Sequence, residues 1–143
     1  MLREIIIKDA LAYSVVSVSE TIIDEINILN ASFRGMNLAV KELKVQPELL
    51  LIDGNRFKNE TAIPHHCLVK GDAQYLSIAA ASILAKTFRD DFMEQLDSEF
   101  PVYNWAQNKG YPTVAHQEAL LRYGRCSYHR RSFQVKGQLR LFN

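Results

Sequence analysis

Apolar residues recur at helical spacing in three parts of the chain. A short helix is predicted over residues 2–10, where apolar and charged positions alternate. A longer helix is predicted after Ser19, and Pro47 prevents it from continuing. Its apolar positions are Ile22, Ile26, Leu29, Phe33, Met36, Val40 and Leu43. Ser19 or Thr21 can cap its start, and Asp24 stands in capping-box position relative to Thr21.

The third helix is predicted over residues 76–96. It opens with Ile78-Ala79-Ala80-Ala81, and such small residues allow a helix to approach a sheet closely. Beyond Pro101 the chain becomes aromatic and irregular. Thr113 is a suitable N-cap for a last helix that ends at Gly124.

Three segments have the composition of strands. Residues 11–19 contain tyrosine and valines with serines interleaved, which favours a β-like conformation. Residues 49–52 and 66–69 are continuous apolar runs, typical of strands covered on both faces, and residues 55–64 between them read as a polar loop. Strands that alternate with helices in this way predict an α/β fold.

Each of the two continuous apolar runs is followed by an acid beside a glycine. Asp53 precedes Gly54, and Asp72 follows Gly71. About a dozen residues separate the two strands, the minimum for a connection that leaves them parallel. Parallel strands would bring both carboxylates to one edge of the sheet, where they could share a metal ion.

The same residues allow two other interpretations. Antiparallel strands would place Asp53 and Asp72 about 15–20 Å apart, too far to share one ion. An aspartate after a strand also commonly forms a turn or caps a helix, because its short side chain accepts hydrogen bonds from nearby amides. Both alternatives stay open at this point.

The composition is that of a single soluble globular domain. The chain has 143 residues, of which 48% are hydrophobic and 23% are charged. No apolar stretch has the roughly 18 residues of a membrane span, and the first residues do not resemble a signal peptide, so a cytoplasmic location is expected. Cys67 and Cys126 match no metal-binding spacing and are predicted to be reduced structural residues.

Positive charge is concentrated near the C-terminus. The net charge is only +1, but no acidic residue follows Glu118. The basic residues beyond that point are Arg122, Arg125, Arg130, Arg131, Lys136 and Arg140, with His129 among them. A basic face of this kind is typical of proteins that bind a phosphate backbone, although a solvated tail would look the same.

Six motifs occur in an order and spacing that resemble one known family, bacterial ribonuclease HII, the type 2 ribonuclease H. They are Ile23-Asp-Glu-Ile-Asn27, Leu51-Ile-Asp-Gly-Asn55, Val69-Lys-Gly-Asp72, Ala79-Ala-Ala-Ser-Ile-Leu-Ala-Lys86 with Arg89-Asp90, Lys109-Gly-Tyr-Pro-Thr113 and His129-Arg-Arg-Ser-Phe133. The resemblance extends over nearly the whole chain.

The resemblance implies a ribonuclease H-like fold and an endonuclease that hydrolyses RNA in RNA–DNA hybrids and at ribonucleotides embedded in duplex DNA. It also implies catalysis by two Mg²⁺ or Mn²⁺ ions that leaves 5′-phosphate and 3′-hydroxyl ends. The family uses four carboxylates, and two of them match Asp53 and Asp72. These two residues are therefore expected to be catalytic metal ligands.

Further residues are expected to bind the substrate. Tyr111 matches the family tyrosine that packs against the sugar beside the ribonucleotide junction. The candidates for contacts with backbone phosphates are Ser82, Lys86, Lys109, Arg130 and Arg131. An ordinary loop tyrosine and solvated lysines are the alternatives. His65 and His66 are not expected to bind metal together, because neighbours on a strand point to opposite faces.

One part of the family pattern is absent. The Asp-Glu-x-Gly-Arg-Gly motif, which carries the other two carboxylates, does not occur in the 143 residues, and neither does the Ser-Lys-Lys-Leu segment that follows it. Asp24-Glu25 does not replace it, because the pair lies within a helical pattern. We therefore interpret residues 1–100 as a truncated α/β core without its first two strands, and residues 101–143 as a helical, basic region.

Three expectations follow from this interpretation. The chain alone is expected not to cleave, since half of its metal-binding carboxylates are absent. A hybrid-binding module without catalysis is the alternative function. In the family fold the absent strands lie in the middle of the sheet, so residues 11–19 are expected to be displaced, disordered or paired with another copy, and the chain is expected to self-associate through exposed sheet edges.

Overall fold

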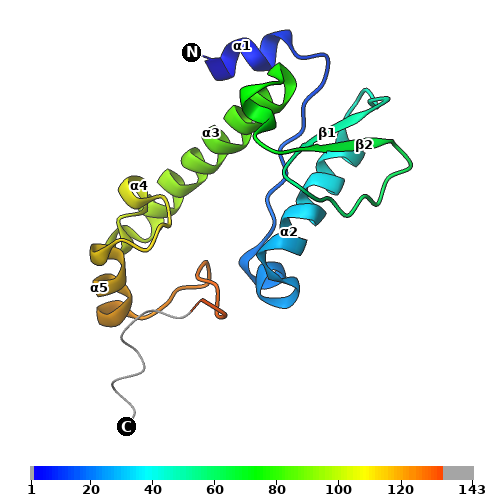
Figure 1. Ribbon diagram of the computed structural model, residues 1–143. Coiled ribbons are helices and arrows are strands. Elements are labelled where there is room, and N and C mark those ends of the chain that lie inside the picture. Colours follow the sequence, from blue (N-terminus) through cyan, green and yellow to red (C-terminus); the bar gives the residue numbers. More distant parts are fainter. Residues whose placement is uncertain (1, 134–143) are drawn as a thin grey trace.

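The computed structural model describes residues 2–133, in which one small sheet lies near α2 and the start of α3, while α4 and α5 lie at the far end of α3 (Figure 1). The elements in chain order are α1 (Leu2–Asp9), α2 (Glu20–Glu42), β1 (Leu50–Asp53), β2 (His65–Leu68), the 3-10 helix η1 (Gly71–Ala73), α3 (Leu76–Glu99), the 3-10 helix η2 (Pro101–Tyr103), α4 (Trp105–Asn108) and α5 (Val114–Tyr123). The predicted α/β class is confirmed. Across the described range, no helix combines the length and the apolar character that a membrane crossing requires.

β1 and β2 pair in parallel, which is the alternative that brings Asp53 and Asp72 to one edge of the sheet. The register runs from Leu50 opposite His65 to Asp53 opposite Leu68. The amide of Gly54 donates to the carbonyl of Leu68 at 3.0 Å, which extends the ladder just beyond Asp53. The carboxyl ends of both strands therefore meet at one edge of the sheet.

The prediction that both strands are covered on both faces is wrong. Leu50 and Ile52 of β1 are buried, whereas no residue of β2 is fully buried and His66 is exposed. The described residues form only these two strands, so few neighbours are available to cover them.

Cys67 and Cys126 are free thiols, as predicted, but each is only half-buried.

α2 is interrupted at Asn27, which the apolar spacing does not predict. The backbone of Asn27 has φ 66° and ψ 166°, and its Oδ1 accepts a hydrogen bond from the amide of Asn30 at 3.1 Å. Asn27 thus caps the second part of the helix from within, while Ser19 caps the first part through the amide of Ile22. The apolar series continues through the break, although the buried residues of α2, Ala31 and Asn37, both lie in its second part.

Residues 11–19 form no strand within the described range, contrary to the β-like pattern of their sequence. A strand needs a neighbour to pair with, and this segment pairs with neither β1 nor β2. Its side chains are exposed or half-buried.

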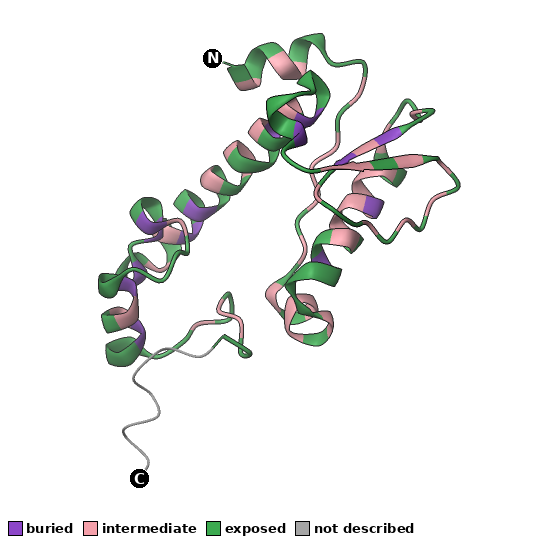
Figure 2. Cartoon of the chain, viewed as in Figure 1, coloured by how far each residue is buried: buried purple, intermediate pink, exposed green. Residues whose placement is uncertain are grey.

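α3 connects the sheet to the C-terminal region (Figure 1). Near its start Ile78 packs against the turn after β2, so closely that a Cβ on Gly71 would lie 2.6 Å from Ile78 Cδ1. Its second half carries the main apolar cluster, which comprises Met93, Leu96, Tyr103, Trp105 and Leu120. Figure 2 shows buried positions where this half of the helix faces α4 and α5. The helix ends at Glu99, three residues beyond the predicted limit.

Candidate active site

Asp53 and Asp72 lie at the same edge of the sheet. Asp53 is the last residue of β1, and Asp72 is the middle residue of η1, directly after β2. The Oδ1 atom of Asp53 accepts a hydrogen bond of 3.0 Å from the amide of Gly71. This bond fixes the Asp53 carboxylate to the turn that carries Asp72. The turn itself depends on Lys70, which has a left-handed backbone with φ 56°.

The two carboxylates suit a hard divalent cation as part of a ligand set. Both residues are exposed, and among residues 2–133 neither carboxylate forms an ion pair. Carboxylate oxygens are the ligands that Mg²⁺ and Mn²⁺ prefer. However, the described part of the chain contains no group of three or more His, Cys, Asp or Glu side chains placed to hold a metal. The pair therefore fits such an ion only if other ligands join it.

Tyr111 stands on a turn that α3 holds in place. Lys109 and Gly110 have left-handed backbones with φ 49° and φ 82°. Arg89 of α3 donates from Nη2 to the carbonyl of Lys109 at 3.1 Å, and Asn108 Oδ1 accepts from the amide of Gly110 at 2.8 Å. The side chain of Tyr111 is 66% exposed, so the fixed turn presents an aromatic ring to solvent.

Gly110→Ala tests this turn. A Cβ at Gly110 would lie 3.2 Å from Arg89 Nη2 and 3.3 Å from Met93 Cε, on a backbone that only glycine adopts easily. We expect chemical denaturation to show a loss of about 1–2 kcal/mol in the free energy of unfolding. Gly124→Ala is the control, since Gly124 has a similar φ of 77° but nothing within 4 Å. Equal losses in the two variants would show that contact with α3 does not hold the turn.

Both lysines that were predicted to bind phosphate are paired with acids of α3. Lys109 Nζ lies 2.7 Å from Glu94 Oε1 and donates to the carbonyl of Asp90. Lys86 forms an ion pair with Asp90, and the hydrogen bond from its ammonium is the main reason that the pKa of Asp90 is lowered. Ser82, one turn before Lys86, is exposed. A phosphate would have to compete with these carboxylates, and the predicted contacts stay predictions.

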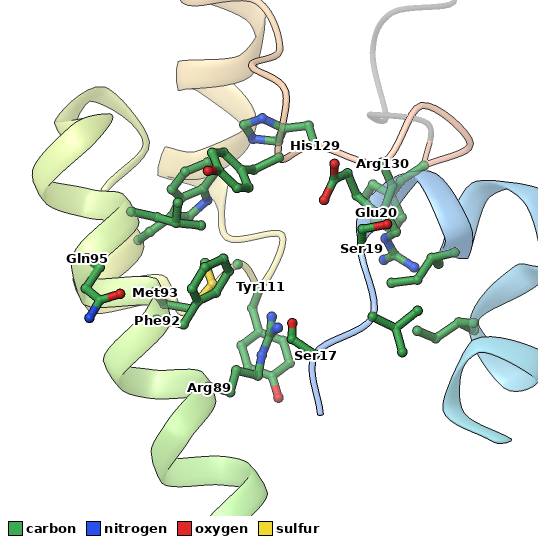
Figure 3. Close-up of a pocket in the computed structure, with 18 of the residues that line it drawn as sticks. Ser17, Ser19, Glu20, Arg89, Phe92, Met93, Gln95, Tyr111, His129 and Arg130 are labelled. Atoms are coloured by element: carbon green, nitrogen blue, oxygen red, sulfur yellow. The ribbon is translucent and has the colours of Figure 1, made fainter. Parts of the chain in front are cut away.

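A cleft of about 1470 Å³ separates α3 and α5 from residues 15–20. Arg89 and Tyr111 line it, as does Arg130. Figure 3 shows Phe92 and Met93 of α3 on one wall and Ser19, Glu20 and Arg130 on the facing wall. The cleft therefore brings two of the predicted substrate-binding residues, Tyr111 and Arg130, to one concave surface. Arg131 is exposed, and Lys136 and Arg140 lie outside the described residues.

Asp24 and Arg125 are functional candidates that the sequence pattern did not single out. Asp24 does not complete the capping box with Thr21; its carboxylate accepts hydrogen bonds from the amides of Arg131 and Ser132. The hydroxyl of Ser132 also donates to this carboxylate and is the main cause that lowers the pKa of Asp24. These partners are more than 100 positions apart, and a single sequence contains no signal for such a contact.

His129 is anchored in an aromatic cluster beside the cleft. Its ring centroid lies 4.6 Å from that of Tyr103 and 5.0 Å from that of Trp105, and His116 is the third neighbour. The amide of Cys126 donates to Nδ1 at 3.2 Å. Burial, reinforced by the charge of His116, lowers the pKa of His129 to about 4. His129 is therefore neutral at physiological pH and acts as an anchor for the segment that carries Arg130.

The lowered pKa of His129 makes stability depend on pH. The unfolded state takes up a proton near its ordinary pKa of 6.5, whereas the folded state does so only near pH 4. The stabilising contribution is therefore complete above the unfolded pKa and is lost as the pH falls towards 4. We expect the melting temperature to drop by about 5 °C between about pH 7 and about pH 5.

His129→Phe should reduce this pH dependence, because the phenyl ring cannot take up a proton. His66→Gln, at an exposed position of β2, is the matched control and should keep it. Melting curves followed by circular dichroism across the pH range measure both. An identical slope in His129→Phe and the unsubstituted chain would contradict the assignment to His129.

The fold resembles that of a solved archaeal enzyme. The structure of the ribonuclease H2 from Pyrococcus horikoshii OT3 superposes with a TM-score of 0.76, and the match covers 93% of this chain and 70% of that chain. The sequences are only 22% identical, so this comparison establishes the fold alone. The fold of this chain is thus an α/β fold like that of the Pyrococcus structure.

Sequence comparison identifies the family. The family model described as ribonuclease HII matches residues 1–136. Ribonuclease HII of Bacteroides fragilis (strain ATCC 25285) is 57% identical over 144 residues, which cover 99% of this chain and 72% of the relative. That of Cytophaga hutchinsonii is 58% identical over 144 residues, with 99% and 71% covered. The chain belongs to the ribonuclease HII family, whose members are divalent-metal-dependent endoribonucleases that act on RNA–DNA hybrids.

Proposed function

We propose that this chain contributes part of the active site and much of the substrate-binding surface of a ribonuclease HII. The reaction is endonucleolytic hydrolysis of RNA in RNA–DNA hybrids, and at ribonucleotides embedded in duplex DNA, to give 5′-phosphate and 3′-hydroxyl ends. Asp53 and Asp72 are the metal ligands in this proposal. The observation that supports it most is the parallel pairing of β1 and β2, which brings both acids to one edge of the sheet.

The chemistry requires carboxylates at this edge. Two bound Mg²⁺ or Mn²⁺ ions would supply an activated water and stabilise the negative charge that develops on the leaving 3′ oxygen. The chain's own residues offset the positive charge of the ions and fix their ligands. The hydrogen bond from the Gly71 amide to Oδ1 orients the Asp53 carboxylate, and Oδ2 has no partner among the described residues.

The proposed substrate-binding role depends on side chains that the fold holds in fixed positions. Tyr111, on its fixed turn, is proposed to pack against the deoxyribose beside the ribonucleotide, where the absence of a 2′-hydroxyl favours the apolar ring. Ser82, Lys86, Lys109, Arg130 and Arg131 are proposed to contact backbone phosphates. For Lys86 and Lys109 such a contact means exchanging the carboxylates of Asp90 and Glu94 for a phosphate.

A hybrid-binding role without cleavage is the second candidate for the 143-residue chain taken alone. It is favoured by the small ligand set, since no third metal-binding side chain joins Asp53 and Asp72 within residues 2–133.

The exposed apolar side chains, with Leu11 and Leu76 at 94% and 87% exposure, support the related proposal that the chain self-associates. The cytoplasm is the proposed location.

Hybrid binding tests the substrate-binding surface directly. Fluorescence anisotropy with a labelled RNA–DNA hybrid of about 20 base pairs measures the affinity. Tyr111→Ala should weaken binding about tenfold, which is the loss expected when one aromatic ring no longer contacts the nucleic acid. Tyr123→Ala is the matched control, because Tyr123 is also an exposed tyrosine but lies at the end of α5. Equal affinities of the unsubstituted chain, Tyr111→Ala and Tyr123→Ala would contradict the role of Tyr111.

A further inference from the structure

Residues 131–133 are held from two sides by side chains of opposite charge. On one side the Asp24 carboxylate accepts from the amide of Arg131 at 2.6 Å and from the amide of Ser132 at 3.1 Å. On the other side the Arg125 guanidinium donates to the carbonyl of Arg131 at 3.0 Å and to that of Phe133 at 2.6 Å. We call this arrangement the backbone clamp. It leaves little freedom to the main chain at these positions.

The break in α2 allows the side chain of Asp24 to reach the segment after α5. The first part of the helix ends at Asn27, whose positive φ turns it away from the second part. Asn27 also caps the second part through Asn30, so the local sequence stabilises the break. An uninterrupted helix would carry Asp24 along the axis of the second part. The kink thus has a specific consequence, which is that Asp24 reaches the segment after α5.

The clamped segment contains Arg131 and directly follows Arg130. Arg130 lines the cleft and lies with its Cζ 5.3 Å from the centre of the Phe133 ring, and Arg131 is exposed. His129 fixes the other end of the segment within the aromatic cluster. Guanidinium groups bind phosphate oxygens through a planar set of donors, and they do so best when the backbone beneath them is already ordered.

We propose that Asp24 and Arg125 are positioning residues for nucleic-acid binding, which hold Arg130 and Arg131 where their guanidinium groups meet backbone phosphates of the hybrid. This inference rests on the proposed function. It predicts the opposite of simple electrostatics, because an acid near a polyanion should weaken binding and its removal should strengthen it. If Asp24 acts through the clamp, its removal weakens binding instead.

Asp24→Asn and Glu25→Gln form a matched pair for the test. Each removes one negative charge from neighbouring positions of the same helix, and only Asp24 accepts hydrogen bonds from residues 131 and 132. Anisotropy titrations with the same RNA–DNA hybrid should give about fivefold weaker binding for Asp24→Asn and unchanged or tighter binding for Glu25→Gln. The slope of log affinity against log salt concentration should become shallower in Asp24→Asn, by the amount that corresponds to about one phosphate contact.

A double-mutant cycle separates positioning from a general loss of structure. In the Arg130→Gln/Arg131→Gln background the Asp24→Asn change should have no further effect on hybrid affinity, because its effect passes through those arginines. Arg125→Lys is the second variant. It keeps the positive charge but cannot reach both carbonyls, and it should also weaken binding. Circular dichroism checks that each variant is folded, and amide exchange at Arg131 and Ser132 reports the clamp without nucleic acid.

The outcomes are distinct. Weaker binding and faster amide exchange in Asp24→Asn, both absent in Glu25→Gln, support the proposal. Hybrid binding that is equal in Asp24→Asn and Glu25→Gln overturns the positioning role and leaves the proposed function intact. A full additional loss in the Arg130→Gln/Arg131→Gln background also overturns it. Failure of the unsubstituted chain to bind the hybrid overturns the proposed function, and this inference with it.

Discussion

The 143-residue chain alone is expected to give no detectable nick in a duplex that contains one ribonucleotide, whereas the chain joined to the family's Asp-Glu-x-Gly-Arg-Gly segment is expected to cut it. The reason is charge: the two divalent ions of the proposed reaction would bring four positive charges together, and Asp53 and Asp72 would offset only half of them. We expect the rates in Mg²⁺ or Mn²⁺ to differ by at least about 10³-fold. Gel analysis of an end-labelled duplex measures both.

The control for this experiment is the same joined protein with Asn-Gln in place of Asp-Glu. It adds the same length and the same packing as the joined segment but not the carboxylates, so it should remain inactive. Cleavage by this control would show that the segment acts by completing the fold. Metal-dependent cleavage by the 143-residue chain alone would contradict the account of the charge requirement.

Asp53→Asn and Asp72→Asn should each lower the cleavage rate of the joined protein by about 10²–10⁴-fold. Asparagine has nearly the same shape and can still accept the Gly71 amide through Oδ1, so the substitution at Asp53 removes little except charge. The two losses should not add if both acids bind in one metal site, as proposed. Single-turnover rates for the two single variants and the double variant test this.

Asp9→Asn at the end of α1 is the control for these two variants, because Asp9 is an exposed acid far from β1 and β2 in the sequence. It should cut at the unsubstituted rate. Losses at Asp53 and Asp72 that multiply in the double variant would indicate that the acids work independently. A rate that is unchanged in either single variant would remove that residue from the metal site.

The parallel sheet could be predicted because it depends on local signals. Apolar runs ending at Asp53 and Asp72, a connection of sufficient length and the glycines beside both acids all favour the same arrangement. The observed strands begin one residue away from the predicted limits and keep the predicted pairing. Helix caps were predicted equally well, since Ser19 and Thr113 accept from the amides that their positions indicate.

Two features of the fold were not predicted by the pattern of apolar and polar positions, and they have different causes. Residues 11–19 have strand-forming side chains but no neighbour to pair with, and composition does not report a neighbour. The break at Asn27 is invisible to a count of apolar positions, because the series continues beyond it. Pairing in space decides the first case, whereas the second depends on a local cap, since Asn27 Oδ1 accepts from the amide of Asn30.

Some residues of the candidate site could be predicted from the sequence, and the contacts of others could not. The residue types at Asp53, Asp72 and Tyr111 indicate their chemistry, and their placement follows from nearby strands and turns. Lys86 pairs with Asp90 one turn further along α3, a spacing that the sequence contains, whereas the ion pair of Lys109 with Glu94 forms only where the turn at 109–111 packs against α3. Asp24 was read as a capping residue, and its partners lie at the other end of the chain.

Paramagnetic NMR with Mn²⁺ tests the central claim most directly, which is that Asp53 and Asp72 hold a common divalent cation. Substoichiometric Mn²⁺ should broaden the amide signals of Gly54, Gly71 and Ala73 before others, and the double variant Asp53→Asn/Asp72→Asn should abolish the effect. Broadening that is centred elsewhere, or that persists in the double variant, would contradict the claim.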